Sequence, residues 1–271
     1  MSAANLQSEV QFVPRRSEDR GHADHGWLKT FHTFSFAMYQ DPRFQKWGTL
    51  RVINEDRVAP GEGFGTHPHR EFEIFSYIVN GELEHRDSMG NREVLKRGDI
   101  QLTSAGTGIR HSEMQHGSNP VHFLQIWSLP QRSGLPPKYY NRHFTDEEKR
   151  DVLVPVVAPV GSKGVTDARE GSGPAPVQSP VWLFSTILSP GKSVTHHLLR
   201  PSRGTQRKAY LHVIQTSGYN KGKASGGLLK VNKDLFLSEG DGSFAQGAES
   251  AEITIENIGD QDAEVLLFDL E

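Results

Sequence analysis

Short runs of β-branched and aromatic residues, separated by glycine and proline, recur along the chain and constrain its fold more than any other feature. Eight runs stand out, at 50–54, 73–79, 99–103, 121–129, 181–188, 209–216, 252–258 and 263–269. The 27 glycines and 15 prolines fall largely between such runs, as expected for strands that are joined by turns. No long segment has the apolar period of an amphipathic helix. The pattern therefore predicts an all-β protein.

One short helix is expected at 145–151. Thr145 and Glu148 have the spacing of a capping box, and two acidic residues between them favour a helix start. A loose tail is expected at 1–15, and long loops are expected at 159–180 and 217–234.

The two halves of the chain share one order of elements, which predicts two domains. Each half has a strand run, then a Gly-Asp turn (Gly98–Asp99 and Gly240–Asp241), then further strands. Prolines and glycines crowd residues 130–145, where they break regular structure and indicate a linker. We expect an N-terminal domain over 1–133 and a C-terminal domain over 134–271, as two copies of one β-barrel.

The composition excludes several classes of site and partner. The chain has no cysteine, which rules out disulfides, thiolate zinc sites, iron–sulfur clusters and cysteine nucleophiles. Its net charge of −3 argues against broad electrostatic binding of nucleic acid. No apolar run approaches the ~18 residues of a membrane span, and the first residues lack a signal-peptide pattern. We expect a cytoplasmic protein, with the nucleus as the alternative, that binds neither membrane nor nucleic acid directly.

Two pairs of metal-ligating residues carry the strongest functional signal. His67 and His69 stand two residues apart, and so do His111 and Glu113. Residues i and i+2 of a strand point to the same face, so each pair offers two ligands in one direction. If the two strands face each other inside a barrel, four ligands converge. Three imidazoles and one carboxylate suit Fe²⁺, Mn²⁺, Ni²⁺, Cu²⁺ or Zn²⁺.

The other histidines carry weaker signals. His196 and His197 are adjacent, so in a strand they point to opposite faces and cannot both bind one ion. His212 stands alone, so we expect no second metal site in the C-terminal half. His85 lies in the turn-like stretch HRDSMGN, where a hydrogen-bonded turn residue is the expected role.

Residues 22–128 resemble the pirin family of cupin proteins. The likeness rests on HADHGWLKTFHTFSF, LRVINEDRVAPGEGFGTHPHREFE, ELEHRDSMGN, RGDIQLTSAGTGIRHSEM and HFLQIW. It is closest to the bacterial pirin-like proteins described as quercetin 2,3-dioxygenases. The second half resembles the family more weakly, through WLFSTILSPGKSV, KAYLHVIQ, SEGDGSF and AEVLLFDL.

The resemblance implies a bicupin, in which two antiparallel jelly-roll barrels follow each other and the N-terminal barrel holds one mononuclear metal. Its ligands are implied to be His67, His69, His111 and Glu113, with Fe²⁺ as the favoured ion. Ordinary cupins take their glutamate from the first motif, which is Glu73 here, and strand parity does not separate the two. The pirin pattern favours Glu113 as ligand and leaves Glu73 to orient a histidine.

The same resemblance implies two functions of different kinds. One is a dioxygenase that cleaves a flavonol such as quercetin with O₂, in which Glu113 accepts the hydroxyl proton. The alternative is a non-enzymatic, redox-sensing iron protein that binds a transcription factor or another protein partner. A third expectation is a metal-binding relic of the fold without turnover.

Overall fold

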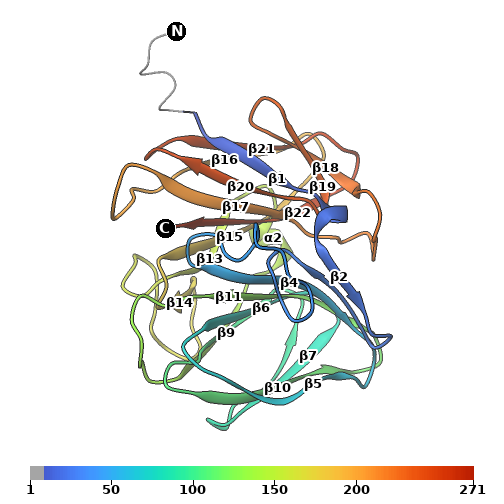
Figure 1. Cartoon of the computed structure of the whole chain (residues 1–271), viewed down its shortest axis with the longest axis vertical. Helices are drawn as coiled ribbons and strands as arrows, with labels where there is room; N and C mark the ends of the chain where they lie inside the picture. Colours follow the sequence, from blue (N-terminus) through green and yellow to red (C-terminus); the bar gives the residue numbers. More distant parts are fainter. Residues whose placement is uncertain (1–8) are drawn as a thin grey trace. The chain divides into compact units, whose positions relative to one another are not determined.

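The computed structural model describes residues 9–271, and its regular secondary structure is almost wholly β-strand (Figure 1). The chain forms two compact units. The N-terminal unit comprises Gly21–Phe144 and Val156–Pro180, and the C-terminal unit comprises the described residues up to Arg20, Thr145–Pro155 and Val181–Glu271. The expected border between residues 133 and 134 falls inside the N-terminal unit. The compact units therefore do not coincide with the expected domains 1–133 and 134–271. Those domains stay a prediction.

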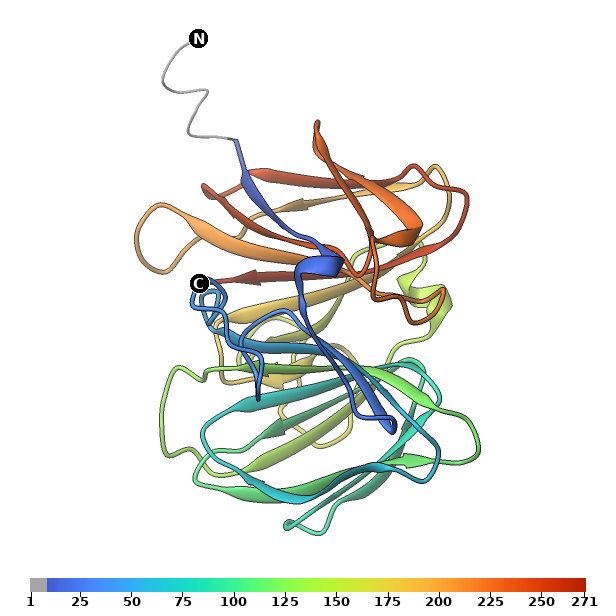
Figure 2. The same cartoon turned by 45° about the vertical axis from the view of Figure 1, so that its right-hand side comes forward.

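Two antiparallel sheets form the two layers of the N-terminal unit (Figure 1, Figure 2). The larger sheet has the order β12 (Lys138–His143), β9 (Asp99–Ser104), β6 (Glu73–Asn80), β11 (Val121–Ser128), β4 (Leu50–Val58), β3 (Leu28–His32) and β2 (Gly21–Asp24). The smaller sheet has the order β5 (Gly63–His69), β10 (Ile109–His116), β7 (Glu82–Asp87) and β8 (Arg92–Lys96). A short parallel pair joins β13 (Val154–Pro159) to β14 (Ala175–Val177).

The C-terminal unit repeats this arrangement. Its larger sheet includes, in this order, β1 (Gln11–Arg15), β20 (Gly242–Gly247), β17 (Arg207–Val213), β22 (Ala263–Leu270) and β15 (Val181–Leu188). Its smaller sheet has the order β16 (Ser193–His197), β21 (Glu252–Asn257), β18 (Ser225–Val231) and β19 (Leu235–Glu239). The order β9-β6-β11-β4 in one unit thus corresponds to β20-β17-β22-β15 in the other. The repeat confirms the expected all-β fold of two jelly-roll domains, each built as a pair of sheets.

Apolar side chains from both layers meet inside the N-terminal unit. Ile78, Val121 and Phe123 come from the larger sheet, and Leu83 and Leu95 come from the smaller one. All five side chains are fully buried. At about 1.5–3 kcal/mol for each large apolar side chain that is removed from water, this cluster holds the two sheets together. The sheets can then carry polar side chains elsewhere on their facing surfaces.

Each of the eight expected strand runs coincides with a strand, in β4, β6, β9, β11, β15, β17, β21 and β22, although the runs 121–129, 209–216 and 252–258 extend past the ends of β11, β17 and β21. The expected helix is α2 (Asp146–Lys149), and the capping box between Thr145 and Glu148 is present. A single 3-10 turn, Ser17–Asp19, is the other helical element of the described chain. Among residues 9–271, no helix has the length and apolar character that a membrane crossing requires.

Several segments that we expected to be irregular contain strands. The expected linker at 130–145 contains β12, and the expected loops at 159–180 and 217–234 contain β14 and β18. The expected tail contains β1, while residues 1–8 lie outside the described part of the chain. These expectations were wrong because pairing with a neighbouring strand supplies backbone hydrogen bonds that local composition does not reveal.

Candidate metal centre

Strand β10 is the centre of the candidate site. Its side chains alternate, so that His111, Glu113 and Gln115 are buried while Arg110 and His116 face solvent. One edge of β10 pairs with β5 and the other edge pairs with β7. Because side chains of neighbouring strands share a face, β10 brings polar groups of three strands together inside the unit.

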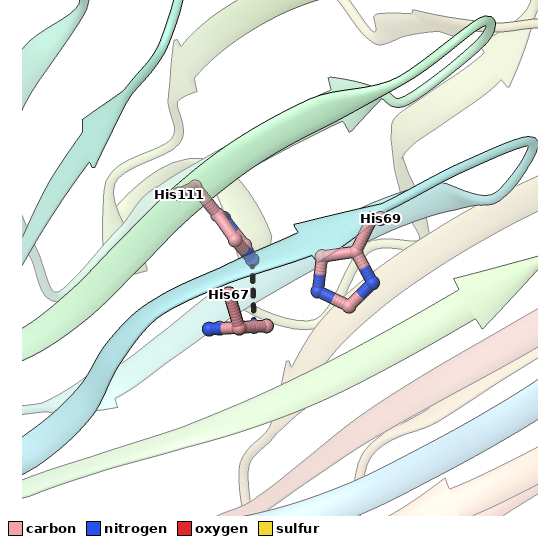
Figure 3. Close-up of side chains that lie close together, drawn as sticks. All are labelled: His67, His69 and His111. Atoms are coloured by element: carbon pink, nitrogen blue, oxygen red, sulfur yellow. Dashed lines mark hydrogen bonds between the residues drawn. The ribbon is translucent and has the colours of Figure 1, made fainter.

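Strand β5 supplies the two histidines of the His-Pro-His motif. His67 lies directly opposite His111 in the pairing of β5 with β10. Gly63 permits the close approach of the two strands, since a Cβ atom there would lie 2.5 Å from the carbonyl oxygen of Glu113. Figure 3 shows His67 and His69 on β5 and His111 on the neighbouring strand, with their rings gathered at one place.

The three imidazoles fit one ion. Their ring centroids are 4.6–4.8 Å apart, and one ring nitrogen from each lies within 4.8 Å of the others. The Nε2 atoms of His67 and His111 are 3.1 Å apart. Two nitrogens that each bind one ion at about 2.1 Å, in neighbouring positions, are separated by roughly 3.0–3.4 Å. The spacing therefore suits metal binding through these nitrogens.

The protonation of the rings also suits a metal. The Nδ1–H of His67 donates to the carbonyl oxygen of Gly65 over 2.7 Å, which leaves Nε2 of the neutral ring free to bind. Burial, with His111 and His67 close by, lowers the pKa of His69 to about 4. Burial also lowers the pKa of His111, although Glu113 opposes the shift. At neutral pH His69 and His111 are uncharged rings with lone pairs available.

Glu113 is buried on β10, but it does not lie in the group of three histidines. Its carboxylate accepts hydrogen bonds from Ser76 Oγ over 2.7 Å and from Gln125 Nε2 over 2.6 Å. A β-bulge shifts the register between His111 and Glu113, so that Phe64 lies opposite Glu113. One oxygen of Glu113 instead lies within 4.8 Å of ring nitrogens of His111 and His85. The structure thus places Glu113 next to His111 and on the β7 side of the site.

Glu73 lies outside both groups of ligating atoms. Arg70–Phe72 interrupts the chain between β5 and β6, with Glu71 at φ 69°, so strand parity does not extend from the histidines to Glu73. The carboxyl group of Glu73 accepts hydrogen bonds from Ser104 Oγ and from the backbone N–H of Gln178. The expectation that Glu73 orients a histidine was therefore wrong. Its contacts stabilise the packing of β6 against β9 and the segment that follows β14.

Replacing Glu73 by glutamine is expected to make the stability of the protein less dependent on pH. Burial raises the pKa of Glu73 to about 7, against the effect of the hydrogen bonds from Ser104 and Gln178. Between its ordinary pKa and this value, the folded protein keeps a proton that the unfolded chain has lost. Stability is therefore complete below about pH 4.5 and falls as the pH rises to 7, by roughly 3 kcal/mol in all.

Urea unfolding of metal-free wild type and Glu73→Gln at pH 5 and pH 8 measures this effect. Between the two pH values the variant is expected to lose roughly 3 kcal/mol less than wild type. Asp56, whose pKa burial also raises to about 7, contributes equally to both proteins and cancels in the comparison. Equal losses would show that Glu73 titrates at its ordinary pKa in the folded protein.

His85 is the site residue whose place the sequence did not reveal. It lies in β7 rather than in a turn, its side chain is fully buried, and its ring is 5.3 Å from that of His111. Its Nε2 lies 3.2 Å from Asp87, which confirms the expected hydrogen bond. The expected position in a turn was wrong, because His85 lies in a strand. The signal in the sequence is the alternation of His85 and Asp87, which matches the i, i+2 spacing of the other pairs.

Aromatic rings border the site on the other side. The indole of Trp127 lies 4.9 Å from the ring of His69, and Phe72 and Phe36 pack against that indole at 5.2 and 5.6 Å. All three aromatic side chains are half-buried. Together they form an apolar wall, the Trp127 wall, which is defined by Phe36, Phe72 and Trp127.

The C-terminal unit has no comparable group of histidines among the described residues. His196 is buried and His197 is exposed, which confirms that they point to opposite faces. The Nε2 of His196 donates to Asp269 over 2.7 Å, and Asp269 also accepts from Arg207. A buried network of one imidazole, one guanidinium and one carboxylate thus occupies β16, β17 and β22, the strands that correspond to β5, β6 and β11.

The chain is similar to known proteins both in sequence and in structure. The family model described as Pirin matches residues 13–128. The chain is 38% identical over 257 residues to the quercetin 2,3-dioxygenase of Escherichia coli, covering 94% of this chain and 97% of that protein. It is 33% identical to a pirin-like protein of Caulobacter vibrioides, covering 95% and 99%. The crystal structure of the Escherichia coli bacterial pirin YhhW in complex with nickel(II) superposes with a TM-score of 0.78 at 35% identity, covering 96% and 99%.

Proposed function

The chain belongs to the pirin family, and from this premise we propose that it is a metal-dependent dioxygenase that cleaves a flavonol such as quercetin with O₂. The observation that carries the proposal is the group of three imidazoles from His67, His69 and His111, with Glu113 beside it. The Escherichia coli relative that is named a quercetin 2,3-dioxygenase aligns over nearly its whole length, which supports the reaction class.

We assign one divalent metal, Fe²⁺, to His67, His69, His111 and Glu113. Imidazole nitrogen with carboxylate oxygen is a donor set for Fe²⁺, and it also accepts Mn²⁺, Ni²⁺, Cu²⁺ or Zn²⁺. The nickel(II) complex of the related bacterial pirin supports a divalent ion in this fold. Binding of Glu113 requires its carboxylate to turn from the β7 side toward His67, since its oxygens now accept from Ser76 and Gln125.

The Trp127 wall supports an aromatic substrate. Planar phenolic rings gain from burial against aromatic faces, which contributes about 0.5–1.5 kcal/mol for each pair beyond the area that is buried. Because the ring of Trp127 lies 4.9 Å from that of His69, a flavonol that packs on this wall brings its oxygens to the histidines. Close placement of the reacting groups is itself a large part of catalysis.

Glu113 is the proposed proton acceptor. When bound, the ion supplies a positive charge that favours the ionised 3-hydroxyl of a flavonol, and O₂ then reacts with the electron-rich ring. The chain must remove the hydroxyl proton. A carboxylate has about four acceptor positions, and Ser76 and Gln125 fill two of those on Glu113. A third position binds the metal, and the fourth remains available for a substrate proton.

Aerobic incubation of the iron-loaded protein with quercetin tests the proposed function. We expect one bound metal per chain, loss of the flavonol absorbance and release of carbon monoxide. The double variant His67→Ala plus His111→Ala is expected to abolish both metal binding and turnover, because it removes two of the three imidazoles. Elemental analysis, spectrophotometry and gas analysis provide the measurements.

The outcomes separate the three expectations. Full metal content in the double variant would contradict the assigned ligands. A wild-type protein that binds one metal but consumes no flavonol under air would favour the regulator or relic. An iron-dependent protein partner, captured only by the metal-loaded chain, would then identify the regulator.

A further inference from the structure

Two buried histidines lie side by side behind the three-imidazole group. His85 on β7 is paired across the sheet with Glu113, and its ring is 5.3 Å from the ring of His111. Both side chains are almost completely buried. Tyr139 packs on the other side of His85 with its ring 4.9 Å away, which limits the rotation of His85. The two imidazoles therefore lie edge to face, with 63° between their planes, in a closed part of the unit.

Asp87 determines which nitrogen of His85 carries the proton. Its carboxylate accepts hydrogen bonds from the backbone N–H groups of Met89 and Asn91 and from the side-chain amide of Asn91. A group held by donors in this way is an ionised acceptor, so the Nε2 of His85, 3.2 Å away, donates its proton to Asp87. When the ring carries only this proton, its Nδ1 is a bare acceptor. It has no hydrogen-bond partner within the described chain.

His111 requires a hydrogen-bond acceptor for its Nδ1–H when its Nε2 binds an ion. Its Nε2 faces the Nε2 of His67 at 3.1 Å, and binding of an ion there requires the lone pair of Nε2. The proton of the neutral ring must then sit on Nδ1, which is buried and has no partner among residues 9–271. Metal-binding histidines almost always donate this second ring N–H to an acceptor, which fixes the ring and raises its basicity.

We propose that His85, held by Asp87, is the positioning residue that accepts the Nδ1–H of His111 when the metal is bound. The inference rests on the metal site of the proposed function. The Nδ1–H of His67 on β5 donates to the backbone carbonyl oxygen of Gly65. His85 thus provides for His111 on β10 the acceptor that this carbonyl provides for His67. The chain Asp87–His85–His111 thus aligns the ligand on the central strand.

Three variants of the full-length protein test this arrangement by their affinity for Ni²⁺. His85→Phe keeps a ring but has no acceptor, and it is expected to weaken Ni²⁺ binding about 10–100-fold. Asp87→Asn can donate to Nε2 of His85, which moves the His85 proton to Nδ1, and a similar loss is expected. His85→Asn places an amide oxygen near the position of Nδ1 and is expected to recover most of the affinity. Competition with a chelator measures each dissociation constant.

A spectroscopic readout separates positioning from general damage. In the Zn²⁺-loaded protein, a protected ring N–H resonance of His111 is expected in wild type and His85→Asn and is expected to vanish in His85→Phe. The matched control is His143→Phe, because His143 also pairs with an aspartate, Asp99 at 2.7 Å, but belongs to neither ligating group. Its Ni²⁺ affinity is expected to equal that of wild type.

Each result decides one question. If wild type and the control bind Ni²⁺ while His85→Phe binds it equally well, the role of His85 is overturned and the metal site stands. Equal weakening in His85→Phe and His85→Asn, with the His111 resonance intact in both, also overturns it. If wild type binds no Ni²⁺, Fe²⁺ or Zn²⁺, the proposed metal site itself fails. Thermal unfolding of the metal-free proteins verifies that every variant is folded before binding is compared.

Discussion

Glu113→Gln is expected to lower flavonol turnover per bound metal by about 10²–10⁴-fold, the range of a general base. Glutamine keeps the size of the side chain and one oxygen donor, but it removes the negative charge and the proton acceptor. Ser76 and Gln125 still find a partner at this position, so the fold is expected to survive. Metal affinity is expected to fall as well, because a neutral ligand replaces an anionic one. Turnover and metal content are therefore measured on the same samples.

Glu73→Gln is the matched control for this experiment. Glu73 is an equally buried glutamate of the same unit, but it bonds Ser104 and Gln178 and lies outside the groups of ligating atoms. We expect its turnover per bound metal to stay within a few-fold of wild type. If Glu73→Gln were the more damaging change, the chain would use the glutamate of ordinary cupins, and the assignment of Glu113 as ligand and base would be wrong.

Asp269→Ala is expected to destabilise the C-terminal unit by about 3–5 kcal/mol. Asp269 is fully buried and accepts hydrogen bonds from His196, Arg207 and the backbone N–H of Leu199. Removal of the carboxylate leaves the buried guanidinium of Arg207 with only Glu271, at the edge of the network. An uncompensated buried charge carries a cost of this size.

Urea unfolding combined with amide hydrogen exchange in β17 and β22 measures that loss in the C-terminal unit itself. Asp262→Ala serves as the control, because Asp262 forms an exposed ion pair with Arg150 at 2.9 Å. Such exposed pairs contribute less than about 1 kcal/mol. A loss in Asp269→Ala no larger than in this control would mean that water reaches Arg207 and replaces the carboxylate.

The fold was predictable where apolar residues mark buried strands. Runs such as 73–79 and 121–129 became β6 and β11, the central strands of the larger sheet. Strand β7 gave no such signal, because its sequence ELEHRD is polar and it buries Glu84 and His85. Glu84 and His85 form hydrogen bonds within the same hairpin, to Arg86, Arg92 and Asp87. Their burial depends on packing against other strands, which no local pattern reports.

The candidate site was predictable in its residues but not in its exact arrangement. The spacing of His67, His69 and His111 anticipated three converging imidazoles, because the two-residue period of strands is robust. Glu113 lies next to His111, but the register shift between them and its position on the β7 side were not predictable, and the turn before Glu73 separates that carboxylate from the rings. Bulges and turns with positive φ depend on tertiary contacts, so they cannot be predicted from the two-residue alternation of side chains in a strand.

The pairing of β1 with β20 has a consequence for how the protein is made. Gln11 lies opposite Gln246, so the first described strand completes the sheet of the C-terminal unit, whereas the next strand, β2, belongs to the N-terminal unit. During synthesis β1 therefore leaves the ribosome on the order of 10–50 s before its partner exists. The strands of the N-terminal unit can pair in that interval, but those of the C-terminal unit cannot. Pairings between such distant segments fold slowly, and until β1 docks, β20 presents an open edge to other chains.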